Sequence, residues 1–153
     1  MRVEFVNPFV EAAREVVESE IGGETDKGQI RLEKSAYTTD EVTAVVGVTG
    51  RVAGVVLYSM SEQTARAIVS RMMGQDFPEF DSLAQSGIGE LGNVITGRAG
   101  VLLSEAGYAS NLTPPALLLG KGATVTTLDL NRLVFPVQTE LGPLEVQVVL
   151  REK

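Results

Sequence analysis

Apolar residues recur along the 153-residue chain with two different periods. Where they recur every three or four residues, they predict three helices. These run from Asn7-Pro8 to Gly22-Gly23, over Glu62–Met73 between an N-cap at Ser61 and a C-cap at Gly74, and from Asp81 or Ser82 to Glu105 or Ala106, with Gly107 as the cap. Short runs rich in Val, Leu and Thr predict strands at 30–36, 41–48, 51–59, 116–119, 124–128, 132–139 and 144–151. The polar stretch 24–28 predicts a loop, and Thr49-Gly50 predicts a tight turn.

The order of these elements predicts the fold class. Strands that follow one another through short loops pair antiparallel, so we expect an α+β fold in which long helices pack on one face of an antiparallel sheet. Each half of the chain begins with a helix and ends in a hairpin with an apolar last strand. This repetition predicts a single domain over residues 1–153 that consists of two pseudo-repeats, at about 1–75 and 76–153.

The composition excludes several kinds of chemistry. Cysteine and histidine are both absent, which rules out disulfides, thiolate catalysis, a Ser-His-Asp triad and metal sites built from Cys or His. A formal net charge of −7 disfavours nucleic acid and anionic membranes as partners. No apolar run approaches the roughly 18 residues that span a bilayer, and Glu4 stands where a signal peptide would be apolar. We therefore expect a cytoplasmic protein.

One face of the third predicted helix carries the residues with the most chemical meaning. At about 100° per residue, a hydroxyl, a carboxylate and a side-chain amide fall within about 60° of one another, and two glycines extend the same face. These residues are Ser86, Glu90, Asn93, Gly97 and Gly100. The apolar residues of the helix fall on the opposite face, which we expect to lie on the sheet.

Five glycines lie between positions 87 and 100 of this helix. Each costs about 1 kcal/mol relative to alanine in a helix interior. One interpretation is that the glycines allow close packing of the helix within the protein and that Glu90 and Asn93 are merely exposed. The other is that bare backbone at Gly89, Gly97 and Gly100 lets another macromolecule approach Asn93 closely.

The chemistry open to Glu90 and Asn93 without histidine, cysteine or a metal is narrow. A side-chain amide is neither a nucleophile nor a base, but it can orient a water molecule through its oxygen and NH₂ group. That role suits hydrolysis of a phosphoryl group, in which catalysis consists mainly of placement and charge stabilisation. The phosphate and its cation would both have to come with a protein substrate, and Glu90 could bind a Lys or Arg of that substrate.

The pattern Ser86-x₃-Glu90-x₂-Asn93, followed after 21 further residues by Pro115, resembles the signature of the CheC/CheX/FliY chemotaxis phosphatases. The order of helices and strands fits this family over essentially the whole chain. The opening Asn7-Pro8-Phe9 and the chain length look most like the CheX branch.

The resemblance implies an activity and roles for these residues. The family hydrolyses the aspartyl phosphate of the response regulator CheY. Asn93 would orient the attacking water, and Glu90 would contact the regulator at its active-site lysine. Ser86 and Pro115 would support the motif. The chain would need no cofactor of its own, because Mg²⁺ comes with the regulator. Family members are dimers, and an open edge of an antiparallel sheet could pair two chains.

Some members of the family carry a second copy of the motif on the first helix. Here the corresponding residues are Asn7, Glu11 and Arg14. Arginine cannot accept a hydrogen bond, so it cannot orient water as an amide does. We therefore predict one working site per chain, with Glu11 and Arg14 on an exposed helix face.

Two other hypotheses stay open at this point. The chain could be a non-enzymatic chemotaxis or flagellar-switch adaptor that only binds signalling proteins, because an acidic surface and an exposed helix suit that role equally well. A metal-dependent hydrolase could use oxygen ligands from Asp76, Glu79, Asp81 and Glu90. Their spacing, however, is not that of a fixed coordination site.

Overall fold

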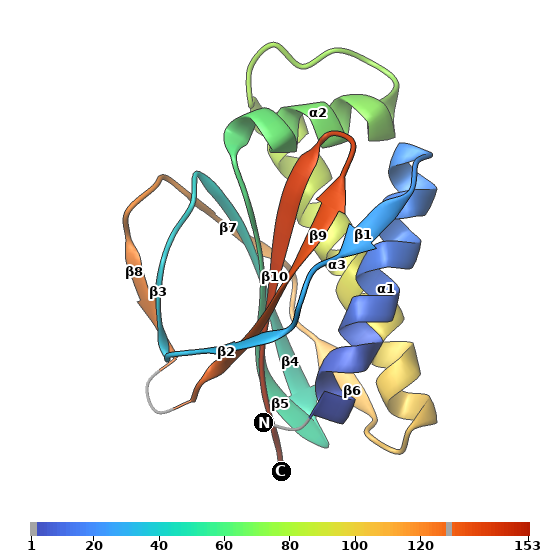
Figure 1. Cartoon of the computed structure of the whole chain (residues 1–153), viewed down its shortest axis with the longest axis vertical. Coiled ribbons are helices and arrows are strands. Elements are labelled where there is room, and N and C mark those ends of the chain that lie inside the picture. Colours follow the sequence, from blue (N-terminus) through green and yellow to red (C-terminus); the bar gives the residue numbers. More distant parts are fainter. Residues whose placement is uncertain (1–2, 128–129) are drawn as a thin grey trace.

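The computed structural model describes residues 3–127 and 130–153. Three helices lie on one face of an eight-stranded antiparallel sheet (Figure 1). The helices are α1 (Val3–Ile21), α2 (Glu62–Met73) and α3 (Ser82–Glu105). Helices α1 and α3 pack side by side along the sheet, and α2 crosses one end of it. The predicted α+β class, with helices packed on one face of an antiparallel sheet, is confirmed. None of the helices in the described part of the chain is long and apolar enough to cross a membrane.

The sheet joins the two halves of the chain. Its strands run in the order β1-β9-β10-β5-β4-β6, with β2 also paired to β9 and β7 also paired to β4. The bounds are β1 (Thr25–Lys27), β2 (Arg31–Glu33), β4 (Val42–Gly50), β5 (Val52–Met60), β6 (Ser110–Leu112), β7 (Ala116–Leu119), β9 (Arg132–Thr139) and β10 (Gly142–Glu152). The short strands of each half pair with the hairpin of the other half, and β5 and β10 meet in the middle. In each half a helix precedes the strands, and α2 follows them only in the first half. The division into two pseudo-repeats stays a prediction.

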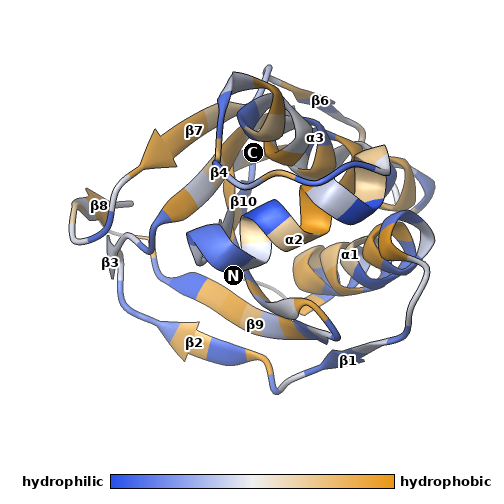
Figure 2. Cartoon of the chain, turned by 90° about the horizontal axis from the view of Figure 1, so that it is seen from above, coloured by the Kyte–Doolittle hydropathy of each residue, from blue (hydrophilic) through white to orange (hydrophobic). Residues whose placement is uncertain are grey.

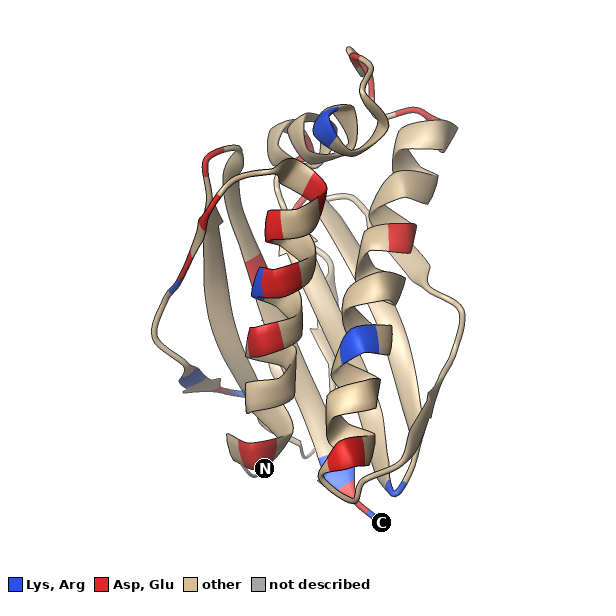
Figure 3. Ribbon diagram, turned by 90° about the vertical axis from the view of Figure 1, so that its right-hand side faces the viewer, with Lys and Arg blue, Asp and Glu red and all other residues tan. Residues whose placement is uncertain are grey.

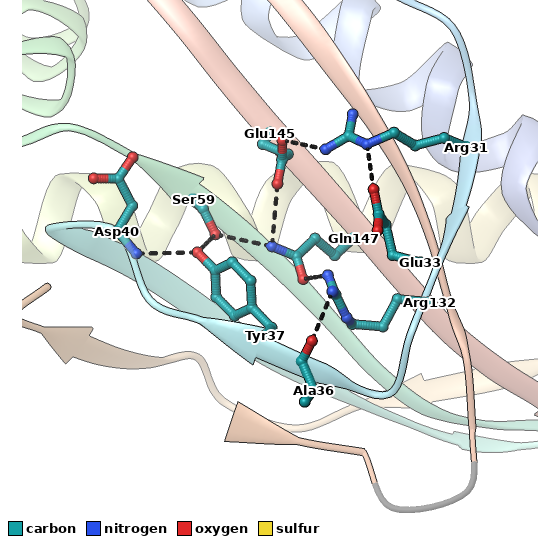
Figure 4. Close-up of polar contacts among 9 residues, drawn as sticks. All are labelled: Arg31, Glu33, Ala36, Tyr37, Asp40, Ser59, Arg132, Glu145 and Gln147. Atoms are coloured by element: carbon teal, nitrogen blue, oxygen red, sulfur yellow. Dashed lines mark hydrogen bonds and ion pairs between the residues drawn. The ribbon is translucent and has the colours of Figure 1, made fainter. Parts of the chain in front are cut away.

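A small ribbon lies on the face of the sheet that the helices leave uncovered (Figure 1). It pairs β3 (Ala36–Thr38) with β8 (Thr124–Thr126). Polar side chains fasten it to the sheet (Figure 4): the buried Arg132 guanidinium donates to Gln147 Oε1 at 2.6 Å and to the Ala36 carbonyl at 3.0 Å, and Tyr37 donates to Ser59 Oγ at 2.6 Å. These polar groups therefore serve the packing of the chain itself.

The core lies between the sheet and the helices, around which the sheet curves (Figure 2). Its largest buried side chains come from both halves of the chain and include Phe9, Tyr58, Ile88, Ile95 and Phe135. Burial of each such side chain stabilises the fold by about 1.5–3 kcal/mol. The same burial fixes which side of α3 points away from the sheet.

The caps of α2 and α3 follow the local sequence. Ser61 Oγ accepts the Thr64 amide at 3.1 Å, and Gly74 has the left-handed φ of 67°, so both predicted caps of α2 are confirmed. At the end of α3 the cap is Ala106 and not Gly107 as predicted. Gly107 is the following residue, with a φ of 96° that favours glycine.

The first helix begins earlier than predicted. It starts at Val3, so Pro8 lies within the helix instead of opening it. Phe5 and Val6 are 1% and 0% exposed, and their burial outweighs the backbone hydrogen bond that proline forfeits. Burial of apolar side chains thus extends α1 to residues before Pro8, although proline alone favours a helix that begins near it.

The short strands are the other departures from prediction. The predicted loop 24–28 contains β1, the predicted strand 30–36 is divided between β2 and β3, and β6 is an additional strand. Strand β4 continues through Gly50, where a tight turn was expected, and β10 begins at Gly142. The predicted strand 124–128 forms β8 over its first three residues, and position 128 lies outside the described residues. A three-residue strand is too short to show an alternation of apolar and polar residues. It forms because a strand elsewhere in the chain pairs with it, so the local sequence does not predict it.

Candidate active site on helix α3

The predicted face of α3 points away from the sheet. Ser86 and Glu90 are exposed and Asn93 is half-buried, whereas the apolar side of the helix, with Ile88 and Ile95, is buried. Figure 3 looks onto α1 and α3: acidic residues follow one another along α1, while α3 carries few charges. Glu90 and Asn93 therefore lie together on a sparsely charged outer surface.

The polar side chains of this face are not used by the protein itself. No hydrogen bond or ion pair joins the side chain of Ser86, Glu90 or Asn93 to any other residue in the ranges that the structure describes. The nearest charged pair on α3 is a turn or more away, where Arg98 Nε lies 3.3 Å from Glu15 Oε2 on α1. A carboxylate and an amide are thus both available to a partner. A supporting contact made by Ser86 stays a prediction.

A buried hydrogen-bond chain fixes α3 to the sheet next to Asn93. Thr96 Oγ1 donates to the Gly92 carbonyl at 2.7 Å, so the Tyr58 hydroxyl, 2.6 Å from Thr96 Oγ1, acts as the donor to Thr96. Burial raises the pKa of Tyr58 far above its usual value, which keeps the phenol protonated for this role. A Cβ at Gly92 would lie 3.3 Å from the Tyr58 ring, so the missing side chain lets the helix sit close to the sheet. The sequence pattern does not predict these hydrogen bonds, and the signal it holds for them is a tyrosine and a threonine at buried positions.

Pro115 reaches α3 from the segment between β6 and β7. Thr113 is fastened to β4 twice: its amide donates to the Gly47 carbonyl at 3.0 Å, and its Oγ1 accepts the Gly47 amide at 2.8 Å. This anchoring places the Pro115 ring against Gly89, where a built Cβ would lie 3.7 Å from Pro115 Cγ. The structure thus brings Pro115 into contact with the residue before Glu90, although 24 residues lie between Glu90 and Pro115 in the chain.

The glycines of α3 fall into two groups. A Cβ at Gly87 would lie 2.8 Å from Met73 Cε, and one at Gly92 would touch the sheet, so these two serve packing within the protein. Gly89 is buried beneath Pro115, so its assignment to an open approach face is wrong. Gly97 and Gly100 are half-buried beside β6, where a Cβ would meet only ordinary contacts at 3.9 and 3.7 Å. The internal packing therefore does not require glycine at these last two positions.

The corresponding face of α1 has a different use. Glu11 is exposed as expected, but Arg14 is half-buried and donates to the carbonyl of Thr25 at 3.0 Å and to its Oγ1 at 3.4 Å. Glu18 Oε1 accepts the Thr25 amide at 3.3 Å. Arg14 thus holds β1 against α1, which corrects the expectation of a freely exposed arginine. A single site per chain stays a prediction.

The acidic residues proposed as metal ligands are not gathered. Among the described residues no group of three His, Cys, Asp or Glu side chains is arranged to hold a metal ion. Asp81 instead caps α3, its Oδ1 accepting the Ala84 amide at 2.9 Å. The arrangement gives no support to the metal-dependent hydrolase.

Three exposed apolar residues on α3 were missed by the sequence analysis. Leu83, Val94 and Val101 are 49%, 38% and 48% exposed. Their angular position around the helix could have identified them, because these apolar residues fall outside the apolar face that packs on the sheet. Val94 directly follows Asn93, and Leu83 and Val101 lie about two helical turns from the pair, toward opposite ends of α3.

Comparisons with known proteins show the family to which the chain belongs. Residues 42–138, which include α3 and Pro115, match the family model described as Chemotaxis phosphatase CheX. The chain is 32% identical over 122 residues to the CheY-P phosphatase CheX of Thermotoga maritima, with 79% of each covered. The solved structure of a CheX from Desulfovibrio desulfuricans is 28% identical with a TM-score of 0.86, covering 98% of this chain and 99% of that one. A CheX from Borrelia burgdorferi, solved in a complex with CheY, BeF3 and Mg²⁺, is 25% identical with a TM-score of 0.83, covering 99% of this chain and 100% of that one. The chain belongs to the CheX family of chemotaxis phosphatases.

Proposed function

We propose that this chain hydrolyses the aspartyl phosphate of a CheY-type response regulator, with Asn93 orienting the attacking water and Glu90 contacting the regulator. The observation that carries the proposal is that the side chains of Glu90 and Asn93 lie one turn apart on the outer face of α3 and form no hydrogen bond or ion pair with other described residues. The Thermotoga relative's name as a CheY-P phosphatase and the complex of the Borrelia relative with CheY support the choice of substrate.

The division of labour follows from the chemistry of the two side chains. Asn93 can accept a hydrogen bond from water through Oδ1 and donate through Nδ2, so it can hold a water in line with the phosphorus atom. The Mg²⁺ ion that neutralises the phosphoryl charge would be the regulator's own, since the relative's complex contains Mg²⁺ together with CheY. The chain then supplies placement alone.

Glu90 is expected to act in docking through its charge. The change Glu90→Gln should weaken affinity for the phosphorylated regulator by about tenfold and reduce turnover, because the amide cannot pair with a lysine. Added salt should weaken the wild-type complex more than the variant complex. Titration calorimetry at two salt concentrations measures both effects, and Glu105→Gln on the same helix is the matched control. Equal affinity of wild type and Glu90→Gln would remove Glu90 from the docking role.

The bare backbone at Gly97 is expected to matter for a partner and not for folding. The change Gly97→Ala should raise the free energy of unfolding by about 0.5–1 kcal/mol, because alanine is the better helix former and its Cβ meets nothing closer than 3.9 Å. If the regulator approaches the backbone there, KM should rise at the same time. Urea unfolding and steady-state dephosphorylation measure the two quantities. A stability gain with an unchanged KM would show that no partner needs this glycine.

Association of two chains through a sheet edge stays a prediction. The two edges are formed by the short strands β1 and β2 on one side and β6 and β7 on the other. Such strands leave backbone groups that a second chain could pair. Sedimentation of the wild-type chain over a range of concentrations measures whether it dimerises.

A further inference from the structure

Two buried hydroxyl groups lie beneath the turn of α3 that carries Asn93, and we name them the Tyr58/Thr96 pair. The two oxygens are 2.6 Å apart, and Thr96 Oγ1 also donates to the Gly92 carbonyl at 2.7 Å. Gly92 directly precedes Asn93, and Thr96 follows Asn93 by three residues. The pair therefore connects the sheet to the backbone on both sides of Asn93.

The sheet side of the Tyr58/Thr96 pair is held rigidly. Tyr58 lies on β5, opposite Ala44 and Val146, and β5 is hydrogen-bonded to β4 on one side and to β10 on the other. Tyr58 is 1% exposed and Thr96 is 0% exposed. A buried hydroxyl without a partner is costly, so both side chains stay in the geometry that keeps them paired. The pair thus ties the place of Gly92 to the middle of the sheet.

The stretch of α3 around Asn93 depends on such contacts, because its own backbone is weakly helical. Five of the 14 residues from Gly87 to Gly100 are glycine, and glycine favours a helix less than any residue except proline. Within this stretch, which the structure describes in full, Thr96 and Arg98 are the residues whose side chains form hydrogen bonds or ion pairs with other described residues. The ion pair of Arg98 with Glu15 is exposed, and exposed pairs contribute little. The Tyr58/Thr96 pair is therefore the buried polar contact that orients this part of the helix.

The contact at Gly92 is specific in its geometry. Apolar burial holds α3 on the sheet but has no preferred direction, whereas a hydrogen bond weakens when its distance or angle changes. A threonine hydroxyl that donates to the carbonyl four residues earlier competes with the backbone amide for that carbonyl and often bends a helix. The carbonyl here belongs to the residue before Asn93, so the Thr96 hydroxyl affects the backbone from which the Asn93 side chain projects.

We propose that Tyr58 and Thr96 are positioning residues, which hold Asn93 where its amide orients the attacking water; this inference rests on the proposed function. Both side chains are buried, so neither contacts the regulator or its phosphoryl group. Hydrolysis that depends on placement is slowed by small displacements of the groups that provide it. Loss of either hydroxyl therefore lowers kcat and leaves KM and the binding of the regulator nearly unchanged.

The test uses Tyr58→Phe and Thr96→Val, each of which removes one hydroxyl with little change in side-chain shape. The matched control is Tyr37→Phe, which removes a phenol hydrogen bond of the same length, 2.6 Å to Ser59 Oγ, on the face of the sheet away from the helices. Steady-state dephosphorylation of a CheY-type regulator in the presence of Mg²⁺ gives kcat and KM, and urea unfolding gives the stability of each variant. We expect kcat to fall about tenfold in each variant of the pair, with KM changed by less than about twofold. The control should lose stability and keep the wild-type kcat.

Two further variants separate positioning from stability. The double variant Tyr58→Phe/Thr96→Val leaves no buried hydroxyl of the pair without a partner, so it should regain part of the stability that each single variant loses. Its kcat should nevertheless stay about tenfold below that of wild type, because the link from the sheet to Gly92 is still missing. Thr96→Ser keeps the hydroxyl, so it should keep kcat within about twofold of wild type.

The outcomes distinguish this inference from the proposed function. A wild-type kcat in both single variants would overturn the positioning role while the phosphatase activity of the wild-type chain stands. A kcat that recovers together with stability in the double variant, or that falls equally in Tyr37→Phe, would also overturn it, because both results follow from loss of stability alone. An absence of turnover by the wild-type chain would overturn the proposed function and this inference with it.

Discussion

Replacement of Asn93 by alanine is expected to slow dephosphorylation of the regulator by about 100-fold or more, which is what loss of a single transition-state contact costs in other enzymes. The reason is that nothing else on the exposed face of α3 can orient a water: Ser86 is two turns away and Glu90 is proposed to contact the regulator. Binding should be nearly unchanged, because the amide contributes little buried area. Single-turnover rates at saturating enzyme measure the loss, and calorimetry measures the binding.

This variant separates catalysis from folding. Alanine is a better helix former than asparagine, so Asn93→Ala should unfold at the same urea concentration as wild type or at a higher one. The matched control is Asn7→Ala, which removes an exposed amide from α1 at the position that corresponds to Ser86 in the motif copy. The control should react at the wild-type rate. A wild-type rate in Asn93→Ala would remove this residue from the mechanism.

The largest effect on stability is expected from Gly54→Ala in the middle of the sheet. A Cβ at Gly54 would lie 1.8 Å from the Val149 carbonyl oxygen, and the φ of this residue is 153°. Backbone on the facing strand cannot yield as a flexible side chain does, so β5 and β10 would have to separate where the two halves of the chain join. We expect a loss of about 3 kcal/mol or more in the free energy of unfolding.

The control for this prediction isolates the clash from the backbone conformation. Gly120 has a φ of 123°, and a Cβ there would meet nothing within 4 Å. Gly120→Ala should therefore cost only the strain of the positive φ, about 1–2 kcal/mol. Urea unfolding of both variants gives the comparison. If Gly54→Ala were no more destabilising than Gly120→Ala, the close approach of β5 and β10 at this point would be disproved.

The elements that could be predicted from sequence are those with a strong local signal. Helix α2 lies between a serine cap and a glycine cap, and α3 has an apolar face over 24 residues, so both were predicted within a residue or two. Strands β1 and β6, in contrast, are three residues long and exist because β9 and β4 offer them partners. No window of local sequence contains that information.

The candidate site also has features that the local sequence predicts and features that depend on contacts with distant parts of the chain. Periodicity alone placed Ser86, Glu90 and Asn93 on one outward face, because the buried side of α3 fixes its rotation. It could not show that Pro115 covers Gly89, because this contact depends on how Thr113 is anchored to β4. The glycines needed for packing could not be told from the others for the same reason: their neighbours come from distant parts of the chain.

The most direct test of the central claim is a multiple-turnover assay, in which a small amount of this chain is mixed with excess phosphorylated CheY-type regulator and Mg²⁺ and the release of inorganic phosphate is followed. We expect each wild-type chain to release many equivalents of phosphate, and Asn93→Ala to release it scarcely faster than the regulator does alone. Binding of the regulator without faster release would identify an adaptor and contradict a phosphatase activity, and an Asn93→Ala chain that turns over like wild type would contradict catalysis by Asn93.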